Sequence, residues 1–298
     1  MPEFPIEAVT FCKKLPGSSQ AVLTRCSDGR IYAVKFTNNP NGARSLASEV
    51  VTTRLAHRLR LPVPDYSFVY VDEWLVSHTD DIGLVCERRI AQYDSGVQYG
   101  SLTPYKSVQD RQVYEYLPSR RHWGVDNQDS FSGILLLDIW MGRLDSRQVI
   151  FVSTGPSRLE PQFIDHRSNL NRLRLASQRS QPPLCRDTQF YEGVRGWGAF
   201  EPWLTAIEEI SEGDVEHAVA LFPENWGVSD EWKQEAKSYL LGRNRCIRSM
   251  ISELRKSEPG LFPNWGKAPC AARVTTNVLE DRPRPFSLSI AAGSGRQE

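Results

Sequence analysis

Two aspartates and one lysine are the residues of this chain whose types and order could do chemistry. Asp145 and Asp165 lie on either side of a stretch that reads as two short strands joined by a turn, and Lys35 lies far upstream within the apolar run 31–36. A lysine can bind phosphate oxygens, and carboxylates are the ligands that Mg²⁺ prefers. The set therefore predicts binding of a phosphorylated nucleotide together with magnesium.

The strand that carries Lys35 is apolar enough to bring its ammonium group into a partly desolvated position, where a charge needs a partner. Glu49, on the helix predicted next in the chain, can provide that partner and leave the lysine placed against α and β phosphates. Taken singly, either residue is more often an ordinary surface charge. The order of strand lysine and helix glutamate favours the phosphate-binding interpretation.

A loop of small residues, 15–20, precedes the first clear strand. Gly17, Ser18 and Ser19 can present backbone N–H groups and hydroxyls to phosphate oxygens. The loop matches neither G-x-G-x-x-G nor the Walker pattern, so an ordinary turn explains it equally well. Ser18 and Ser19 are also candidate autophosphorylation sites.

Asp145 lies in the polar loop 142–148, between an apolar helix and the strand-like run 149–152. A carboxylate there can accept the proton of an attacking hydroxyl or orient that hydroxyl, although a loop aspartate can also simply cap the local backbone. The apolar segment 162–164 delivers Asp165 after a turn at 154–158. A hairpin over this stretch returns Asp165 beside Asp145, which makes Asp165 a predicted Mg²⁺ ligand.

Composition sets the limits for these interpretations. The chain has 298 residues, of which 40% are hydrophobic, and 36 basic residues balance 36 acidic ones. This length suffices for one large domain or two lobes, and the balanced charge gives no bulk attraction to nucleic acid or an anionic membrane. Six dispersed cysteines without zinc-ligand spacing indicate reduced thiols, and the N-terminus lacks the features of a signal peptide. We therefore expect a cytoplasmic protein.

Strand signals dominate the first hundred residues. A hairpin is predicted from 21–24 and 31–36 around a turn containing Asp28-Gly29, followed by a helix over 45–59 and strands over 66–71 and 74–76. The polar, glycine-containing stretch that follows predicts a lobe boundary near 90–105.

Helical signals dominate the second half. A very apolar helix over 131–140 is predicted to thread the core, and apolar spacing indicates further helices over 200–210 and 214–221. A long closing helix then begins near Ser229 as N-cap and runs to about residue 254. After residue 256 the chain is rich in Pro, Gly, Ser and Arg, which predicts a mostly mobile tail over 257–298.

With these residues in place, the chain resembles the HipA-like kinases, relatives of the kinase of bacterial HipA toxin–antitoxin pairs. The resemblance rests on six segments: Pro16-Gly17-Ser18-Ser19, Tyr32-Ala33-Val34-Lys35-Phe36, Ser48-Glu49-Val50 leading to Leu61-Pro62-Val63-Pro64, Asp138-Ile139-Trp140, Asp145, and Phe163-Ile164-Asp165. It implies that Lys35 binds ATP phosphates and Glu49 orients it. It also implies that Asp145 is the catalytic aspartate, that Asp165 holds Mg²⁺, and that a protein serine or threonine is phosphorylated.

Two departures from the family pattern bear on activity. The residue five beyond Asp145 is the apolar Ile150, where such loops usually carry an asparagine as second metal ligand. Gln148 has the same amide oxygen on a longer arm and is the candidate replacement. Arg143 also stands where the family often has asparagine. These departures keep open a nucleotide-binding pseudokinase that acts as a scaffold.

The sequence therefore predicts an α+β, two-lobed protein-kinase-like fold. Residues 1–104 would form an N-terminal antiparallel sheet lobe with one main helix that binds ATP, 105–256 a mainly helical catalytic lobe, and 257–298 the tail. The predicted function is Mg-ATP-dependent transfer of the γ-phosphoryl group to a protein Ser/Thr hydroxyl, with a small-molecule phosphotransferase as a further alternative. A protein substrate is expected, the resemblance allows an antitoxin-like partner, and neither direct nucleic-acid binding nor a membrane association is expected.

Overall fold

The computed structural model describes residues 5–79, 83–86, 89–104, 113–117, 124–143, 145–168, 170, 184–185 and 188–268. These residues divide into two compact units, one made of 5–42 and 65–113 and the other of 43–64 and 114–268, within the gaps just given. Among the described helices, none has the length and apolar character that a membrane crossing requires.

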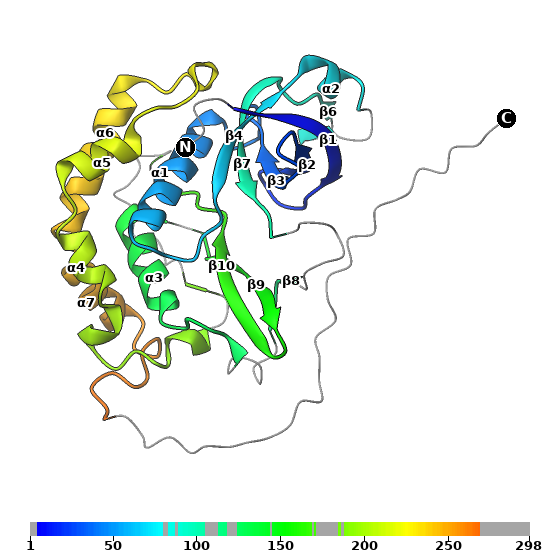
Figure 1. The fold of residues 1–298 in the computed structure, drawn as a ribbon. Helices are drawn as coiled ribbons and strands as arrows, with labels where there is room; N and C mark the ends of the chain where they lie inside the picture. The colour runs from blue at the N-terminus through cyan, green and yellow to red at the C-terminus, as the bar shows by residue number, and fades with distance from the viewer. Residues whose placement is uncertain are drawn as a thin grey trace. The chain divides into compact units, whose positions relative to one another are not determined.

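The first unit is built on a closed five-stranded barrel (Figure 1). Its strands follow one another around the barrel in this order: β1 (Ile6–Lys14), β2 (Val22–Cys26), β3 (Ile31–Lys35), β7 (Gly96–Leu102) and β4 (Tyr66–Val71). The barrel encloses a core that includes Val22, Val34, Phe36 and Val69. The predicted hairpin and the predicted strand 66–71 are therefore confirmed.

The sheet differs from the prediction in its closure. Neighbouring strands are antiparallel except β1 and β4, which pair in parallel through Ile6 with Val69 and Glu7 with Tyr70. That pairing joins the two ends of the sheet, so the expected purely antiparallel sheet is wrong at this one seam. β1 has two bulge-like register shifts on its β2 side, and such shifts bend a strand and increase its twist.

The predicted strand over 74–76 is also wrong, because this segment is the short helix α2 (Glu73–Ser77). Asp72 is its N-cap and accepts a hydrogen bond from the backbone N–H of Trp74 at 2.7 Å. The cap satisfies an otherwise orphaned donor and starts a helix despite the strand-favouring residues that follow. A small two-stranded sheet, β5 (Leu84–Cys86) with β6 (Arg89–Ala91), completes this unit.

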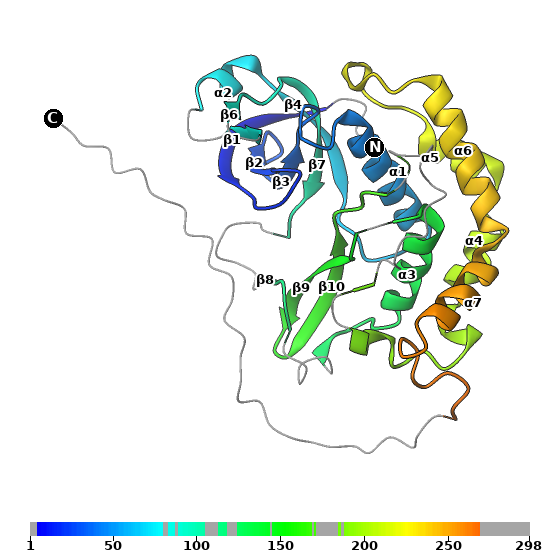
Figure 2. The same ribbon diagram turned by 180° about the vertical axis from the view of Figure 1, so that it is seen from behind.

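The second unit holds α1 (Ala43–Arg58), α3 (Ser130–Met141) and a sheet of order β10-β9-β8, with β8 at Val113–Tyr114, β9 at Gln148–Gly155 and β10 at Arg158–Ile164. Every residue of α3 is buried. Phe131 on α3 lies 5.0 Å from Phe163 of β10 and 6.5 Å from Phe151 of β9, measured between ring centroids, so the helix packs on this hairpin (Figure 2). The predicted core helix and the predicted hairpin are confirmed.

The remaining helices of the second unit are α4 (Trp203–Glu208), α5 (Glu212–Val219), α6 (Asp230–Asn244), α7 (Ile247–Ser257) and the 3₁₀ segments Thr188–Tyr191, Trp197–Phe200 and Glu224–Trp226. Ser229 caps α6 as predicted, accepting from the N–H of Trp232 at 3.3 Å. The predicted single closing helix is wrong, because a turn at residues 245–246 separates it into the two helices α6 and α7.

Residues 258–268, within the segment predicted as a tail, follow α7 and pack on the second unit. Leu261 and Phe262 are buried, and the ring of Phe262 packs edge-on against Phe200 and Tyr191. These apolar contacts hold residues 258–268 to the second unit. Residues 269–298 of the predicted tail lie outside the described residues.

Candidate functional site

The predicted site residues fall in both units. Gly17, Ser18, Ser19 and Lys35 belong to the first unit, whereas Glu49, Asp145, Gln148 and Asp165 belong to the second. Those of the second unit are brought together around one end of the β9–β10 hairpin.

In the first unit, residues 15–20 form the turn between β1 and β2. The N–H of Leu15 donates to the carbonyl of Ala21 at 2.7 Å, and the N–H of Gln20 donates to the carbonyl of Gly17 at 3.2 Å. Gly17 has φ +118°, a value that L side chains rarely adopt, so glycine is required there. Lys35 ends β3 opposite Tyr99 of β7 and is buried.

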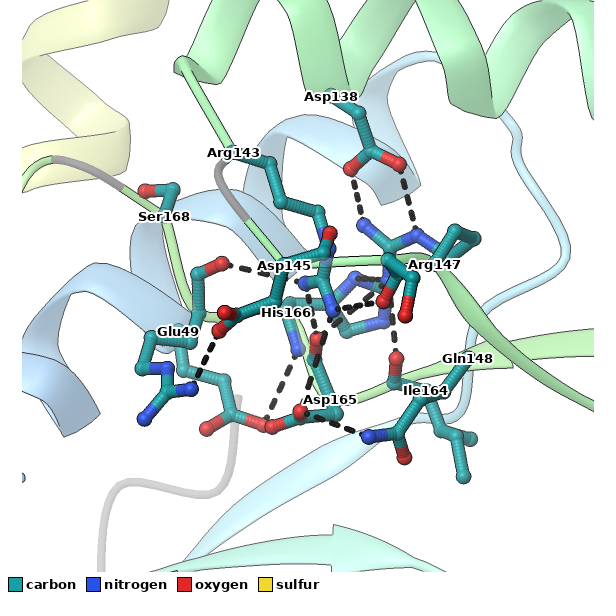
Figure 3. A network of polar contacts seen from close by, with 12 residues as sticks. Glu49, Asp138, Arg143, Asp145, Arg147, Gln148, Ile164, Asp165, His166 and Ser168 are labelled. Carbon is teal, nitrogen blue, oxygen red and sulfur yellow. Dashed lines mark hydrogen bonds and ion pairs between the residues drawn. The ribbon is translucent and has the colours of Figure 1, made fainter. Parts of the chain in front are cut away.

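In the second unit, the register of the hairpin explains how Asp145 and Asp165 come close in the fold. Gln148 at the start of β9 pairs with Ile164 at the end of β10. The loop that precedes β9 and the loop that follows β10 therefore leave the same end of the ladder. Figure 3 shows the polar contacts that gather there.

Arg143 lies between these two loops and is almost fully buried. On the first loop its Nε donates to the carbonyl of Asp145 at 2.9 Å and its Nη2 to that of Ser146 at 3.0 Å. On the second loop its Nη1 donates to the carbonyls of Asp165 and, at 3.1 Å, Arg167. Burial lowers the pKa of Arg143 to about 10, and the neighbouring Arg147 adds to this effect. The side chain is still a cation near neutral pH.

A second buried arginine, Arg147, makes a two-pronged ion pair with Asp138 of α3 (Figure 3). Its Nη1 also donates to the carbonyl of Ile164 at 2.9 Å. Burial alone would lower the pKa of Arg147, but the charge and hydrogen bonds of Asp138 raise it. The pair therefore ties the core helix to the end of β10 through a charged contact sheltered from water.

Asp145 is half exposed, and its carboxylate is ion-paired with Arg167 from the loop after β10. This contact gives the predicted catalytic carboxylate a cationic neighbour. The guanidinium of Arg167 therefore competes with any other hydrogen-bond donor for the oxygens of Asp145.

Asp165 has φ +56°, a left-handed conformation that aspartate tolerates better than most residues. Its carboxylate is about one quarter exposed, lies 3.9 Å from Arg143 Nη2 and accepts from the amide of Gln148 at 3.3 Å. Gln148 and Asp165, both predicted metal ligands, are therefore neighbours.

Helix α1 contributes Glu49 and Ser48 to the same region. The backbone N–H of His166 donates to Glu49 Oε1 at 3.4 Å. The hydroxyls of Ser48 and Ser168 lie 2.8 Å apart, and the N–H of Ser168 donates to Ser48 Oγ at 3.2 Å. Glu49, which the sequence predicts as the partner of Lys35, is bonded in the structure to the loop that carries Asp165.

The donor set suits a magnesium ion that completes its shell with substrate oxygens. Within the residues that the structure describes, His, Cys, Asp and Glu form no group of three or more able to hold a metal. Mg²⁺ is commonly bound by only one or two carboxylates together with phosphate oxygens and waters. The partly exposed carboxylate of Asp165 and the amide of Gln148 match that requirement.

Arg147 and Asp138 had no assigned role in the sequence-based prediction, and Arg143 appeared only as a departure. A signal for the pair was present, because Asp138 interrupts an apolar helix and a buried carboxylate needs a partner. Arg143 gave no such signal, since its partners are backbone carbonyls.

Residues 10–120 match the sequence model of a family described as HipA-like kinase. The resemblance to that family is confirmed over this part of the chain. The matched range contains residues 17–19, Lys35 and Glu49 but ends before the β9–β10 hairpin.

Among the solved structures that are similar to the chain are three kinases, each at 12% identity. A proinflammatory kinase of Helicobacter pylori, CtkA, is covered over 99% of its length by 85% of this chain, with a TM-score of 0.48. A Golgi casein kinase with Mn/ADP bound matches over 74% of its length and 86% of this chain, with a TM-score of 0.49. HipA of Shewanella oneidensis MR-1, in a complex with HipB and operator DNA, matches over 75% of its length and 86% of this chain, with a TM-score of 0.41. No curated protein matches the sequence.

Proposed function

We propose that this protein is a HipA-like kinase that uses Mg-ATP and transfers the γ-phosphoryl group to a serine or threonine hydroxyl of a protein. The observation that carries the proposal is the gathering of Asp145, Gln148, Asp165 and Glu49 at one end of the β9–β10 hairpin. The family match over residues 10–120 supports the same class of reaction.

Each residue has a role in this proposal. Lys35 and the turn residues Gly17, Ser18 and Ser19 bind phosphate oxygens. Asp165 and Gln148 hold Mg²⁺, which neutralises charge on the phosphates when it is bound. Asp145 orients the attacking hydroxyl and accepts its proton, and Glu49 holds the loop that presents Asp165. Because phosphoryl transfer needs little covalent help, positioning accounts for most of the catalysis.

The test is thermal unfolding of the full chain with ATP alone, Mg²⁺ alone and both. A ligand that binds only the native state raises the unfolding midpoint, by an amount that grows with its concentration relative to Kd. We expect stabilisation that requires both ligands and is lost in Asp165→Asn and on addition of EDTA. Asp126→Asn is the matched control, because Asp126 pairs with Arg158 at the surface of the same unit. Stabilisation that persists in Asp165→Asn rules out this metal site.

A second candidate, a pseudokinase that binds nucleotide without transferring phosphate, is favoured by two observations. Ile150 lies within β9, paired with Gln162, where an active loop would offer an asparagine, and the Asp145 carboxylate is engaged by Arg167. Incubation with radiolabelled ATP and a protein mixture distinguishes the two. Label transfer that disappears in Asp145→Asn supports the kinase, and binding without transfer supports the pseudokinase.

Partner and substrate class are proposals of the same kind. A protein substrate follows from the family resemblance, and an antitoxin-like protein partner is a further possibility by that resemblance alone. Phosphorylation of metabolites but not of proteins in parallel screens would replace the protein kinase with the small-molecule alternative.

A further inference from the structure

We infer that Arg143 is a positioning residue that fixes the Asp145 loop and the Asp165 loop relative to one another. The role of Arg143 in catalysis rests on the proposed function, whereas its geometry rests on hydrogen bonds within the second unit. In the sequence, Arg143 stands where the family often has asparagine, which suggests a loss of activity. In the structure, Arg143 lies at the centre of the site (Figure 3).

The side-chain hydrogen bonds of Arg143 are divided equally between the two loops. A guanidinium group has five N–H donors in a rigid, planar fork. Here the fork donates to two carbonyls of the loop before β9, at Asp145 and Ser146, and to two of the loop after β10, at Asp165 and Arg167. One planar group therefore sets the separation of the two loops that carry the proposed base and the proposed metal ligand.

The helix end before Arg143 fixes the direction from which its side chain enters. Gly142 ends α3 in the left-handed conformation, with φ +65°, and its N–H donates to the carbonyl of Ile139 at 3.1 Å. The N–H of Arg143 then donates to the carbonyl of Asp138 at 2.9 Å. These are the bonds of a closed helix C-terminus, which leaves little freedom at the backbone of Arg143.

The charge of the Arg143 guanidinium also acts on the Asp165 carboxylate. Arg143 lies 3.9 Å from the Asp165 carboxylate, and Asp138 and Asp145 also stabilise its charge. A buried cation that could move closer to a metal-binding carboxylate would repel the metal ion and weaken its binding. Holding it by four carbonyls keeps its charge at a set distance from Asp165.

Lysine is the informative replacement, because it keeps the charge but has three donors on one nitrogen and cannot span both loops. We expect Arg143→Lys to fold and to show at least about tenfold faster amide hydrogen exchange in peptides covering 145–148 and 165–168 together. Thermal unfolding of the wild type with ATP and increasing Mg²⁺ should give the Mg²⁺ concentration at which stabilisation is half-maximal. We expect this concentration to be about tenfold higher for Arg143→Lys.

Arg243→Lys is the matched control. Arg243 also donates to backbone carbonyls, those of Ile139 and Trp140 on α3, and within the part of the chain that the structure describes it makes no hydrogen bond to either loop. We expect it to lower stability without changing exchange in the two loops or the Mg²⁺ midpoint. A merely structural role for Arg143 predicts the same pattern for both variants.

Two results would overturn the inference. One is faster exchange of Arg143→Lys in a single loop or evenly across the unit, and the other is an unchanged Mg²⁺ midpoint. If wild-type protein shows no stabilisation by Mg-ATP, the proposed kinase function fails instead, and the exchange measurement alone decides whether Arg143 couples the loops.

Discussion

At the scale of single residues, Asp165 combines a partly exposed carboxylate with a left-handed backbone. Its φ is +56°, and its carbonyl accepts from the buried Arg143, with Arg147 Nη1 3.5 Å away. Left-handed backbone at a residue with a side chain persists where the surroundings hold it in place, and such residues cluster at functional sites. The carboxylate direction is therefore set by the backbone as well as by Gln148.

Replacing Asp165 by glycine or by alanine tests that backbone conformation. Both changes delete the carboxylate, but glycine adopts positive φ without strain and alanine does not. We expect Asp165→Gly to have a free energy of unfolding about 1 kcal/mol higher than Asp165→Ala, measured by urea denaturation. Equal values would mean that the loop relaxes to an unstrained conformation.

At the scale of elements, the buried pair of Asp138 and Arg147 links α3 to the β9–β10 hairpin. Removing one partner leaves an uncompensated buried charge, so we expect Asp138→Asn to lower the free energy of unfolding by about 3–5 kcal/mol. The double variant Asp138→Leu/Arg147→Met removes both charges and should lose less stability than the sum of the losses in Asp138→Leu and Arg147→Met, measured by denaturant unfolding. Additive losses would show that the pair is not coupled.

The start of α5 carries a pH-dependent contribution to stability. Asp214 accepts from the hydroxyl and N–H of Ser211 and pairs with Arg58, and the bonds from Ser211 hold its pKa below the usual 3.8. As pH falls, the unfolded chain binds the proton first, so this stability is present above 3.8 and is lost below it as pH passes through the native pKa.

Asp214→Asn is the variant that checks this pH dependence. We expect the wild type to have the higher melting temperature at about pH 5, and the difference to shrink by about pH 3. A difference that stays constant with pH would show that the stabilisation by Asp214 does not depend on its ionisation.

Element types were predictable where apolar spacing was strong. The sequence predicts α1, α3, the β2–β3 hairpin and the β9–β10 hairpin because their apolar residues repeat with the period of each structure. It misses β7, since Gly96 and Gly100 read as a lobe boundary, and it places a strand where Asp72 caps a helix. The candidate site residues also differ in how predictable they were. The carboxylates were predicted from the loops in which they lie, whereas the position of Arg143 depends on contacts with backbone carbonyls that local sequence patterns do not encode.

At the scale of the whole molecule, the segment after α7 belongs to the second unit up to residue 268. Besides the buried Leu261 and Phe262, the N–H of Gly266 donates to the carbonyl of Arg195 at 2.8 Å. We expect a chain ending at Ser257 to be less stable than one ending at Ala268 by about 3 kcal/mol, from the lost burial of these side chains.

Denaturant unfolding of the two truncated chains measures this difference. Phe262→Ala in the full chain should reproduce a large part of it, because its ring packs against Phe200 and Tyr191. Equal stability of the two truncated chains would show that the segment contributes no net free energy.

The parallel seam between β1 and β4 has a consequence for self-association. Because the seam closes the barrel, each of its five strands has a neighbour on both sides. Where β1 and β4 pair, at Ile6–Glu7 and Val69–Tyr70, no backbone edge is left on which another chain can add a strand and start an aggregate. In the adjoining β5–β6 hairpin, the side-chain amide of Gln20 pairs with both the N–H and the carbonyl of Val85, each at 2.8 Å. A protein that binds the barrel at the paired strands β1 and β4 therefore has to contact their side chains, because it cannot extend the sheet there.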